Sequence, residues 1–134
     1  MSEQESTRLV QQAYDGFKTG NIQALLDTLS NEVEWQLPDI ENVPFSGARR
    51  GREQVGEFFA EVDKEQEVLE FELKEFIAQN DKVVVLGHYS WSVKSTGRKF
   101  AANWVHIFTV RGGNIARFQE FTDTAAAAAA YRES

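Results

Sequence analysis

Apolar residues near the N-terminus recur every three or four positions, which is the period of an amphipathic helix. Leu9, Ala13 and Phe17 follow this spacing from one turn to the next. Ser2 and Glu5 precede the apolar run and form the S-x-x-E pattern of a capping box. The pattern therefore predicts a first helix that begins just after Ser2.

Two further helices follow from similar signals. Gly20 is placed to end the first helix in a left-handed turn. Asn21 can then cap a second helix over residues 22–29. A third helical pattern covers residues 52–62.

The rest of the chain changes to the alternating pattern of strands. Val33, Trp35 and Leu37 alternate with polar residues and predict a half-buried strand. A loop follows from Pro38 to Arg50. Four more strands are expected at residues 67–78, 82–95, 98–111 and 114–122. Helices followed by an antiparallel meander predict one α+β domain over residues 1–134, with helices on one face of the sheet.

The alanine run 125–130 predicts a short terminal helix, because alanine is the best helix former and Asp123 can cap it. We assign this helix no function of its own.

Turn residues suggest how the last three strands pair. A two-residue turn at Thr96-Gly97 would place Tyr89 opposite Trp104 and Gly87 opposite His106, leaving space beside the imidazole. Every pair of this hairpin would lie on the same face of the sheet.

The next hairpin has two possible registers. A three-residue turn at 112–114 pairs Arg111 with Ile115 and brings His106 opposite Glu120. A two-residue Gly-Gly turn would instead pair His106 with Gln119. We favour the first, since it also places Phe108 opposite Phe118 on an apolar face.

His106 and Glu120 are therefore our candidate catalytic residues, as cross-strand neighbours on an inner face. A carboxylate beside an imidazole can fix its tautomer, and such a pair suits general acid–base chemistry. The same residues could equally form a structural pair. Tyr14, Phe17, Trp35, Phe59, Tyr89, Trp91 and Trp104 are the candidate substrate-binding residues, or else ordinary core aromatics.

Composition narrows the classes of partner. A net charge of −7 argues against nucleic-acid binding, although Arg49, Arg50 and Arg52 form a small basic patch. The chain has no cysteine, no apolar run long enough to span a bilayer and no signal pattern at its start. We expect a cytoplasmic protein without a membrane partner. His88 and His106 have opposite strand parity, so we expect no metal site.

The outer face of the sheet carries Val84, Leu86, Val105 and Ile107. An apolar patch of this kind often marks an interface, so we expect a homodimer through this face. A run of glutamates indicates a solvated strand edge: Glu65, Glu67, Glu70, Glu72 and Glu75.

Four stretches together resemble a known family: YDGFKTGNIQALLDTLSNEVEW, PFSGARRGREQVGEFF, FIAQNDKVVVLG and VHIFTVRGGNIARFQEFTDT. They are similar to SnoaL-like, ketosteroid-isomerase-related proteins of the nuclear transport factor two-like superfamily. The resemblance implies a cone-shaped, highly curved sheet wrapped around N-terminal helices, a pocket in the cone and a homodimer. The fold hosts isomerases, cyclases, dehydratases, hydrolases and non-catalytic binders.

The resemblance also bears on single positions. His106 falls where steroid isomerases place an oxyanion-stabilising acid, and Glu120 falls where related hydrolases place an acid on the last strand. Trp35 occupies the position of the isomerase base, which argues against a steroid isomerase, and no arginine flanks the acid as in the epoxide hydrolases. Tyr14 lies one position from the isomerase tyrosine.

Two functions follow as hypotheses. The first is a cofactor-independent enzyme of isomerase, cyclase, dehydratase or hydrolase type that acts on a small apolar or cyclic organic ligand. The second is a non-catalytic dimeric module that binds such a ligand unchanged.

Overall fold

The computed structural model describes residues 2–132, which form helices packed against a six-stranded sheet. In chain order the elements are α1 (Glu3–Thr19), α2 (Ile22–Leu26), β1 (Leu29–Gln36), β2 (Ala48–Arg50), α3 (Gly51–Glu65), β3 (Gln66–Gln79), β4 (Lys82–Val93), β5 (Lys99–Arg111), β6 (Asn114–Thr122) and α4 (Thr124–Tyr131).

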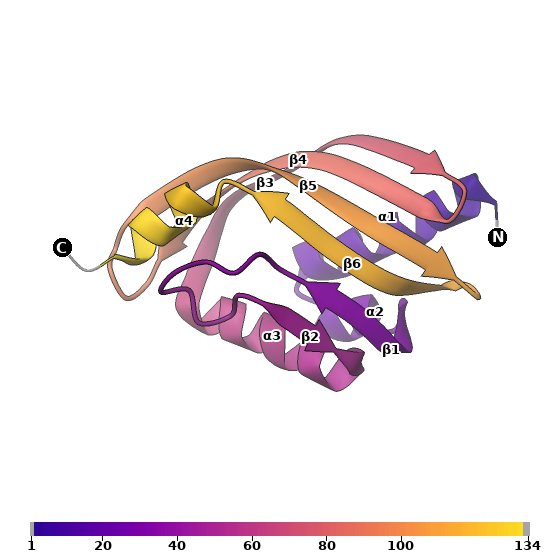
Figure 1. The fold of residues 1–134 in the computed structure, drawn as a ribbon, viewed down its shortest axis with the longest axis horizontal. Coiled ribbons are helices and arrows are strands. Elements are labelled where there is room, and N and C mark those ends of the chain that lie inside the picture. Colours follow the sequence, from indigo (N-terminus) through magenta and orange to yellow (C-terminus); the bar gives the residue numbers. More distant parts are fainter. Residues whose placement is uncertain (1, 133–134) are drawn as a thin grey trace.

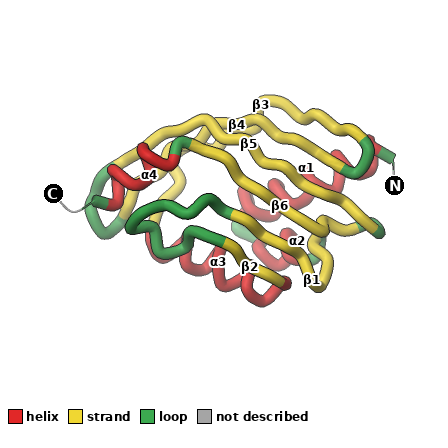
Figure 2. Tube along the Cα trace, viewed as in Figure 1, coloured by secondary structure: helices red, strands yellow, loops and turns green. Residues whose placement is uncertain are grey.

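The sheet is open, strongly curved and ordered β2-β1-β6-β5-β4-β3. Helices α1 and α3 lie against its concave side, and α4 lies at one end (Figure 1). The loop between β1 and β2 reaches the same end as α4 (Figure 2). The predicted α+β class, with N-terminal helices inside a curved sheet, is confirmed.

Local signals for the helices are confirmed. Ser2 and Glu5 form the capping box, and Gly20 ends α1 in the left-handed region with φ of 77°. The Asn21 side chain accepts a hydrogen bond from the Ala24 amide, and Asp123 caps α4 in the same way.

The second helix is shorter than expected, because Leu29 begins β1 instead of ending α2. Leu29 is fully buried and pairs with Ile115 of β6, which runs parallel to β1. The short strand β2 was not expected either. It pairs Arg49 with Trp35 inside the region predicted to be a loop.

The predicted register of the β4–β5 hairpin is wrong by two residues. The loop between Val93 and Arg98 holds four residues rather than two, so Gly87 lies opposite Trp104 and Val85 lies opposite His106. Because the shift is even, each side chain keeps its expected face. The gap at Gly87 is filled by the Trp104 indole, which a Cβ at this position would hit.

The predicted β5–β6 pairing is confirmed around the candidate catalytic residues, with His106 opposite Glu120 and Phe108 opposite Phe118. The expected turn is wrong, since Arg111 pairs with Asn114 across a two-residue Gly-Gly turn. A register shift between Thr109 and Val110 compensates for the shorter turn.

Candidate active site in the concave face

Two adjacent strands bring His106 and Glu120 together on the concave side. His106 Nε2 lies 3.6 Å from Glu120 Oε1, and the two side chains are only 8% and 11% exposed. The imidazole stacks on the Trp104 indole at 3.9 Å between ring centroids. The pair is therefore held in a nearly dry environment, where electrostatic interactions are strong.

Helix α1 supplies a third member. Tyr14 Oη lies 2.6 Å from His106 Nδ1. A neutral imidazole offers one donor and one acceptor. If Tyr14 donates to Nδ1, the proton of the ring is on Nε2 and faces the Glu120 carboxylate. The opposite tautomer would turn the Nε2 lone pair toward that carboxylate, so the surroundings select the Nε2–H form.

Burial controls the charge of these groups. It lowers the pKa of His106 below its ordinary value, although the hydrogen bond and charge of Glu120 act in the opposite direction. Burial, together with the nearby Glu120, raises the pKa of Tyr14. Both groups are therefore neutral hydrogen-bonding partners near pH 7.

Strand β4 adds Tyr89, whose Oη donates to Glu120 Oε1 at 2.7 Å and lies 3.0 Å from Thr122 Oγ1. Burial and Glu120 raise the pKa of Tyr89, which keeps the phenol protonated as a donor. Thr122 in turn donates to the Asn103 carbonyl. We call Tyr14, His106, Glu120, Tyr89 and Thr122 the polar chain.

The polar chain forms one side of a cavity of about 120 Å³. Most of the wall is apolar and aromatic. Of the candidate substrate-binding residues, those that line the cavity are Tyr14, Phe17, Trp35, Phe59, Tyr89 and Trp91. Trp104 does not line it, because its indole lies behind His106 in the space above Gly87.

Sequence reasoning missed several parts of the wall. Thr122 could have been found, since it lies two residues after Glu120 and so faces the same side. Gln66 lies at the start of β3, outside the predicted strand, and no sequence pattern indicated that it faces the cavity. The loop between β1 and β2 and helix α4 also contribute, through Leu37, Pro38, Ile40, Val43, Phe45, Ser46 and Ala127.

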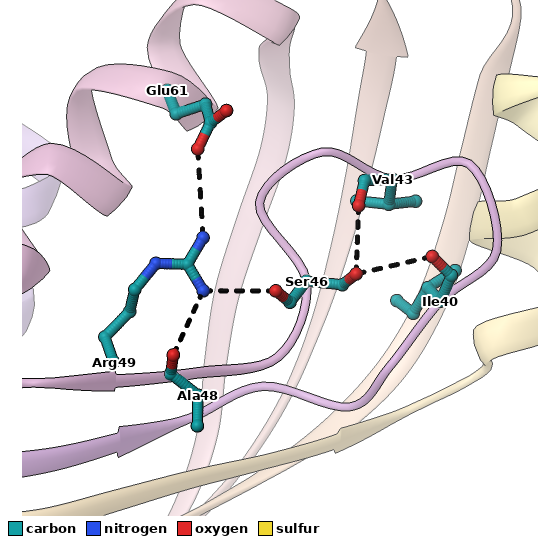
Figure 3. A network of polar contacts seen from close by, with 6 residues as sticks. All are labelled: Ile40, Val43, Ser46, Ala48, Arg49 and Glu61. Carbon is teal, nitrogen blue, oxygen red and sulfur yellow. Dashed lines mark hydrogen bonds and ion pairs between the residues drawn. The ribbon is translucent and has the colours of Figure 1, made fainter.

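The β1–β2 loop is held together by its own polar contacts (Figure 3). Ser46 Oγ donates to the carbonyls of Val43 and Ile40, and Arg49 donates to the Ser46 carbonyl at 3.1 Å. Arg49 also lies 3.8 Å from Glu61 of α3. The loop therefore covers the cavity as a compact unit tied to α3.

The other two arginines of the basic patch also have partners within the chain. Arg52 donates to the Leu29 carbonyl, and Arg50 lies 3.8 Å from Glu34. Among residues 2–132, no cluster of three or more His, Cys, Asp or Glu side chains could hold a metal ion. Within the same residues, no helix is both long and apolar enough to cross a membrane.

These features define the chain as an α+β protein whose curved sheet encloses an aromatic cavity with a buried polar chain. The chain belongs to the SnoaL-like family, because the model of the SnoaL-like domain matches residues 10–118. A search among curated proteins finds no match.

Solved structures agree with this assignment. An NTF2-like protein from Burkholderia xenovorans LB400 is 31% identical, with 98% of this chain and 99% of that chain covered and a TM-score of 0.90. TerC, crystallised with polyporic acid, is 26% identical over 96% and 99% of the two chains, with a TM-score of 0.81. A candidate polyketide cyclase from Xanthomonas campestris is 22% identical over 98% and 100%, with a TM-score of 0.78, and shares the fold.

Proposed function

We propose that this protein is a small-molecule enzyme that moves a proton on a cyclic or aromatic substrate with its own side chains. The observation that carries the proposal is the environment of Glu120. Its Oε1 is held by Tyr89 and faces His106, while the residue itself lines the cavity. Glu120 Oε2 is then the oxygen that can take a proton from a bound substrate.

The neighbouring donors complete the chemistry. The Nε2–H of His106 and the hydroxyl of Tyr89 stabilise the carboxylate before the transfer. Either donor can also stabilise negative charge that develops on a substrate oxygen. Tyr14 acts through His106 as a positioning residue. The reaction type within the isomerase, cyclase, dehydratase and hydrolase group is open, and we place it in the cytoplasm.

The test is turnover of a panel of small cyclic ketones, lactones and epoxides by the purified protein, with product analysis. Glu120→Gln keeps the shape of the side chain and an acceptor for Tyr89, but it removes the base. We expect at least a ~100-fold loss of kcat in this variant. Glu75→Gln, a matched change on the exposed edge of β3, should leave kcat unchanged. Full activity of Glu120→Gln would refute the assignment.

The second candidate is a binding module that holds its ligand unchanged. It is favoured by the similar TerC structure, which was crystallised with polyporic acid. Native mass spectrometry distinguishes the two functions, because a binder returns the ligand with its mass and structure unchanged.

We also propose that the protein is a homodimer through the convex face of the sheet. Ile77, Val84, Ile107, Val105 and Phe121 are linked by strand pairing across four strands, β3 to β6. Ile77 is 47% exposed and Phe121 is 52% exposed in the single chain. Burial of this apolar row against a second copy would remove it from water.

A further inference from the structure

The end of the cavity near α4 contains a polar group that the proposed chemistry does not use. Gln66 is the first residue of β3, is only 5% exposed and lines the cavity. Its Oε1 accepts a hydrogen bond from Tyr131 Oη at 2.7 Å. Its Nε2 has no hydrogen-bond partner among residues 2–132. Nε2 is not among the fully buried atoms without a partner, so it is accessible from the cavity and can donate to a ligand there.

Helix α4 holds the Gln66 amide in this orientation. Tyr131 is buried in the last turn of the helix, and the Thr96 hydroxyl donates to the neighbouring Ala130 carbonyl at 2.7 Å. The terminal helix therefore has a role that its alanine-rich sequence did not suggest: it fixes the far end of the cavity.

The distance between the two polar ends limits the ligand. Gln66 pairs with Val93 of β4, four residues from Tyr89, which is bound to Glu120. Four residues of a strand span roughly 13 Å, which sets the scale of the distance between the two polar ends. One ring with a substituent at each end fits this gap. A cavity of about 150 Å³ holds benzene, so a volume of about 120 Å³ limits the ligand to a single ring.

Charge limits the ligand further. Among residues 2–132, no Lys or Arg side chain lines the cavity, and its acidic group is Glu120. An anionic ligand would be buried beside a carboxylate with no cation to balance it, which is strongly unfavourable. The walls between the two polar ends include Trp91 and Phe100, which suit a flat ring.

We propose that the substrate is an uncharged one-ring compound with an oxygen at each end, one at Glu120 and the other accepting a hydrogen bond from Gln66 Nε2. This inference rests on the proposed function for the placement of the reacting end at Glu120. It adds a second contact, which sets the length and orientation of the substrate.

The test compares 4′-methoxyacetophenone with 4′-ethylacetophenone, which have the same length but differ in the oxygen at the far end. NMR titration gives Kd for each probe. The wild type should bind the methoxy probe roughly three- to tenfold more tightly. Gln66→Met should reduce this ratio to about one, whereas Gln79→Met, on the exposed end of the same strand, should keep it. The ratio compares two ligands on one protein, so a general loss of stability cancels.

A second measurement needs no variant. The side-chain amide signal of Gln66 in ¹⁵N-labelled wild type should shift on addition of the methoxy probe and stay in place with the ethyl probe. Four results would each overturn the inference. These are equal affinities of the wild type for the two probes, an unchanged affinity ratio in Gln66→Met, absence of binding by both probes, and equally tight binding of 4-methoxybenzoate. Glu120→Gln should keep the preference for the methoxy probe. Loss of turnover in Glu120→Gln with the preference retained bears on the acid–base proposal alone. Loss of the preference in Gln66→Met with turnover retained bears on the role of Gln66 alone.

Discussion

His106 is placed between an acceptor and a donor, and this arrangement decides what the imidazole can do. Tyr14 lies at Nδ1 and Glu120 lies at Nε2, so the neutral ring satisfies both neighbours in one tautomer only. A protonated ring would have to donate from Nδ1 to the Tyr14 oxygen, and the Tyr14 proton would then need a new partner in a buried site. The geometry and the lowered pKa of His106 therefore favour the same neutral state.

The neutral state predicts how stability depends on pH. In the unfolded chain His106 titrates at its ordinary pKa of about 6.5, and in the folded protein burial lowers that pKa. Between the two values the unfolded state binds more protons, so the free energy of unfolding falls as the pH falls below 6.5. We expect this group to contribute a slope of up to about 1.4 kcal/mol per pH unit, measured by urea unfolding from pH 7.5 to 5.

His106→Asn is the matched control for this prediction. The amide oxygen of Asn can still accept from Tyr14, but the side chain does not titrate. The other titrating groups are shared by both proteins, so the difference between the two stability curves isolates His106. Parallel curves for wild type and variant would show that His106 has the same pKa in the folded and unfolded states, and the lowered pKa would be refuted.

At the scale of elements, strand β4 is shaped by one glycine. A Cβ at Gly87 would collide with the Trp104 indole and with the Glu72 carbonyl. We expect Gly87→Ala to destabilise the protein by about 3 kcal/mol, because the indole that supports His106 would be displaced. Urea unfolding measures this loss.

Gly56→Ala in α3 is the comparison, since a Cβ there meets only Leu26 at an ordinary contact distance of 3.4 Å. It should be neutral or slightly stabilising, because alanine is a better helix former than glycine. If Gly87→Ala were as stable as Gly56→Ala, the packing of Trp104 over β4 would be wrong.

The hairpins show which features of these elements can be predicted from sequence. Alternation placed Tyr89, His106 and Glu120 on the inner face. This placement is correct although the predicted turns of both hairpins are wrong. Turn lengths were not predictable in the same way, because Thr96-Gly97 and Gly112-Gly113 each allow several loops. The parallel pairing of β1 with β6 joins segments far apart in the chain and leaves no local pattern.

The candidate site likewise contains residues that strand patterns predict and residues that only tertiary packing places. His106 and Glu120 lie on adjacent strands, so strand parity and register could bring them together. Gln66 and the β1–β2 loop reach the cavity only through tertiary packing against α4 and α3, which periodicity does not encode. Tyr14 shows the same limit, because its helix position indicated burial but not its hydrogen bond to His106.

At the scale of the whole molecule, the two faces of the sheet have different tasks. The concave face uses its aromatic residues to build the cavity, while the convex face carries an apolar row with no partner among residues 2–132. The polar pair of His88 and Asn103, at 2.9 Å, lies beside that row. Both properties come from strand alternation, since consecutive residues of β4 and β5 serve opposite faces.

The proposed dimer is tested at this scale with Phe121→Arg. The side chain is 52% exposed, so the change should leave the fold intact, but two copies of the arginine would lie close together in a symmetric interface. Sedimentation velocity should give wild type at twice the chain mass of 15.2 kDa and the variant at the chain mass. Leu69→Arg replaces a residue that is 45% exposed but lies on the edge strand outside the row, and it should remain a dimer. A monomeric wild type at micromolar concentration would show that the convex face is stable in water, and the dimer would have to be abandoned.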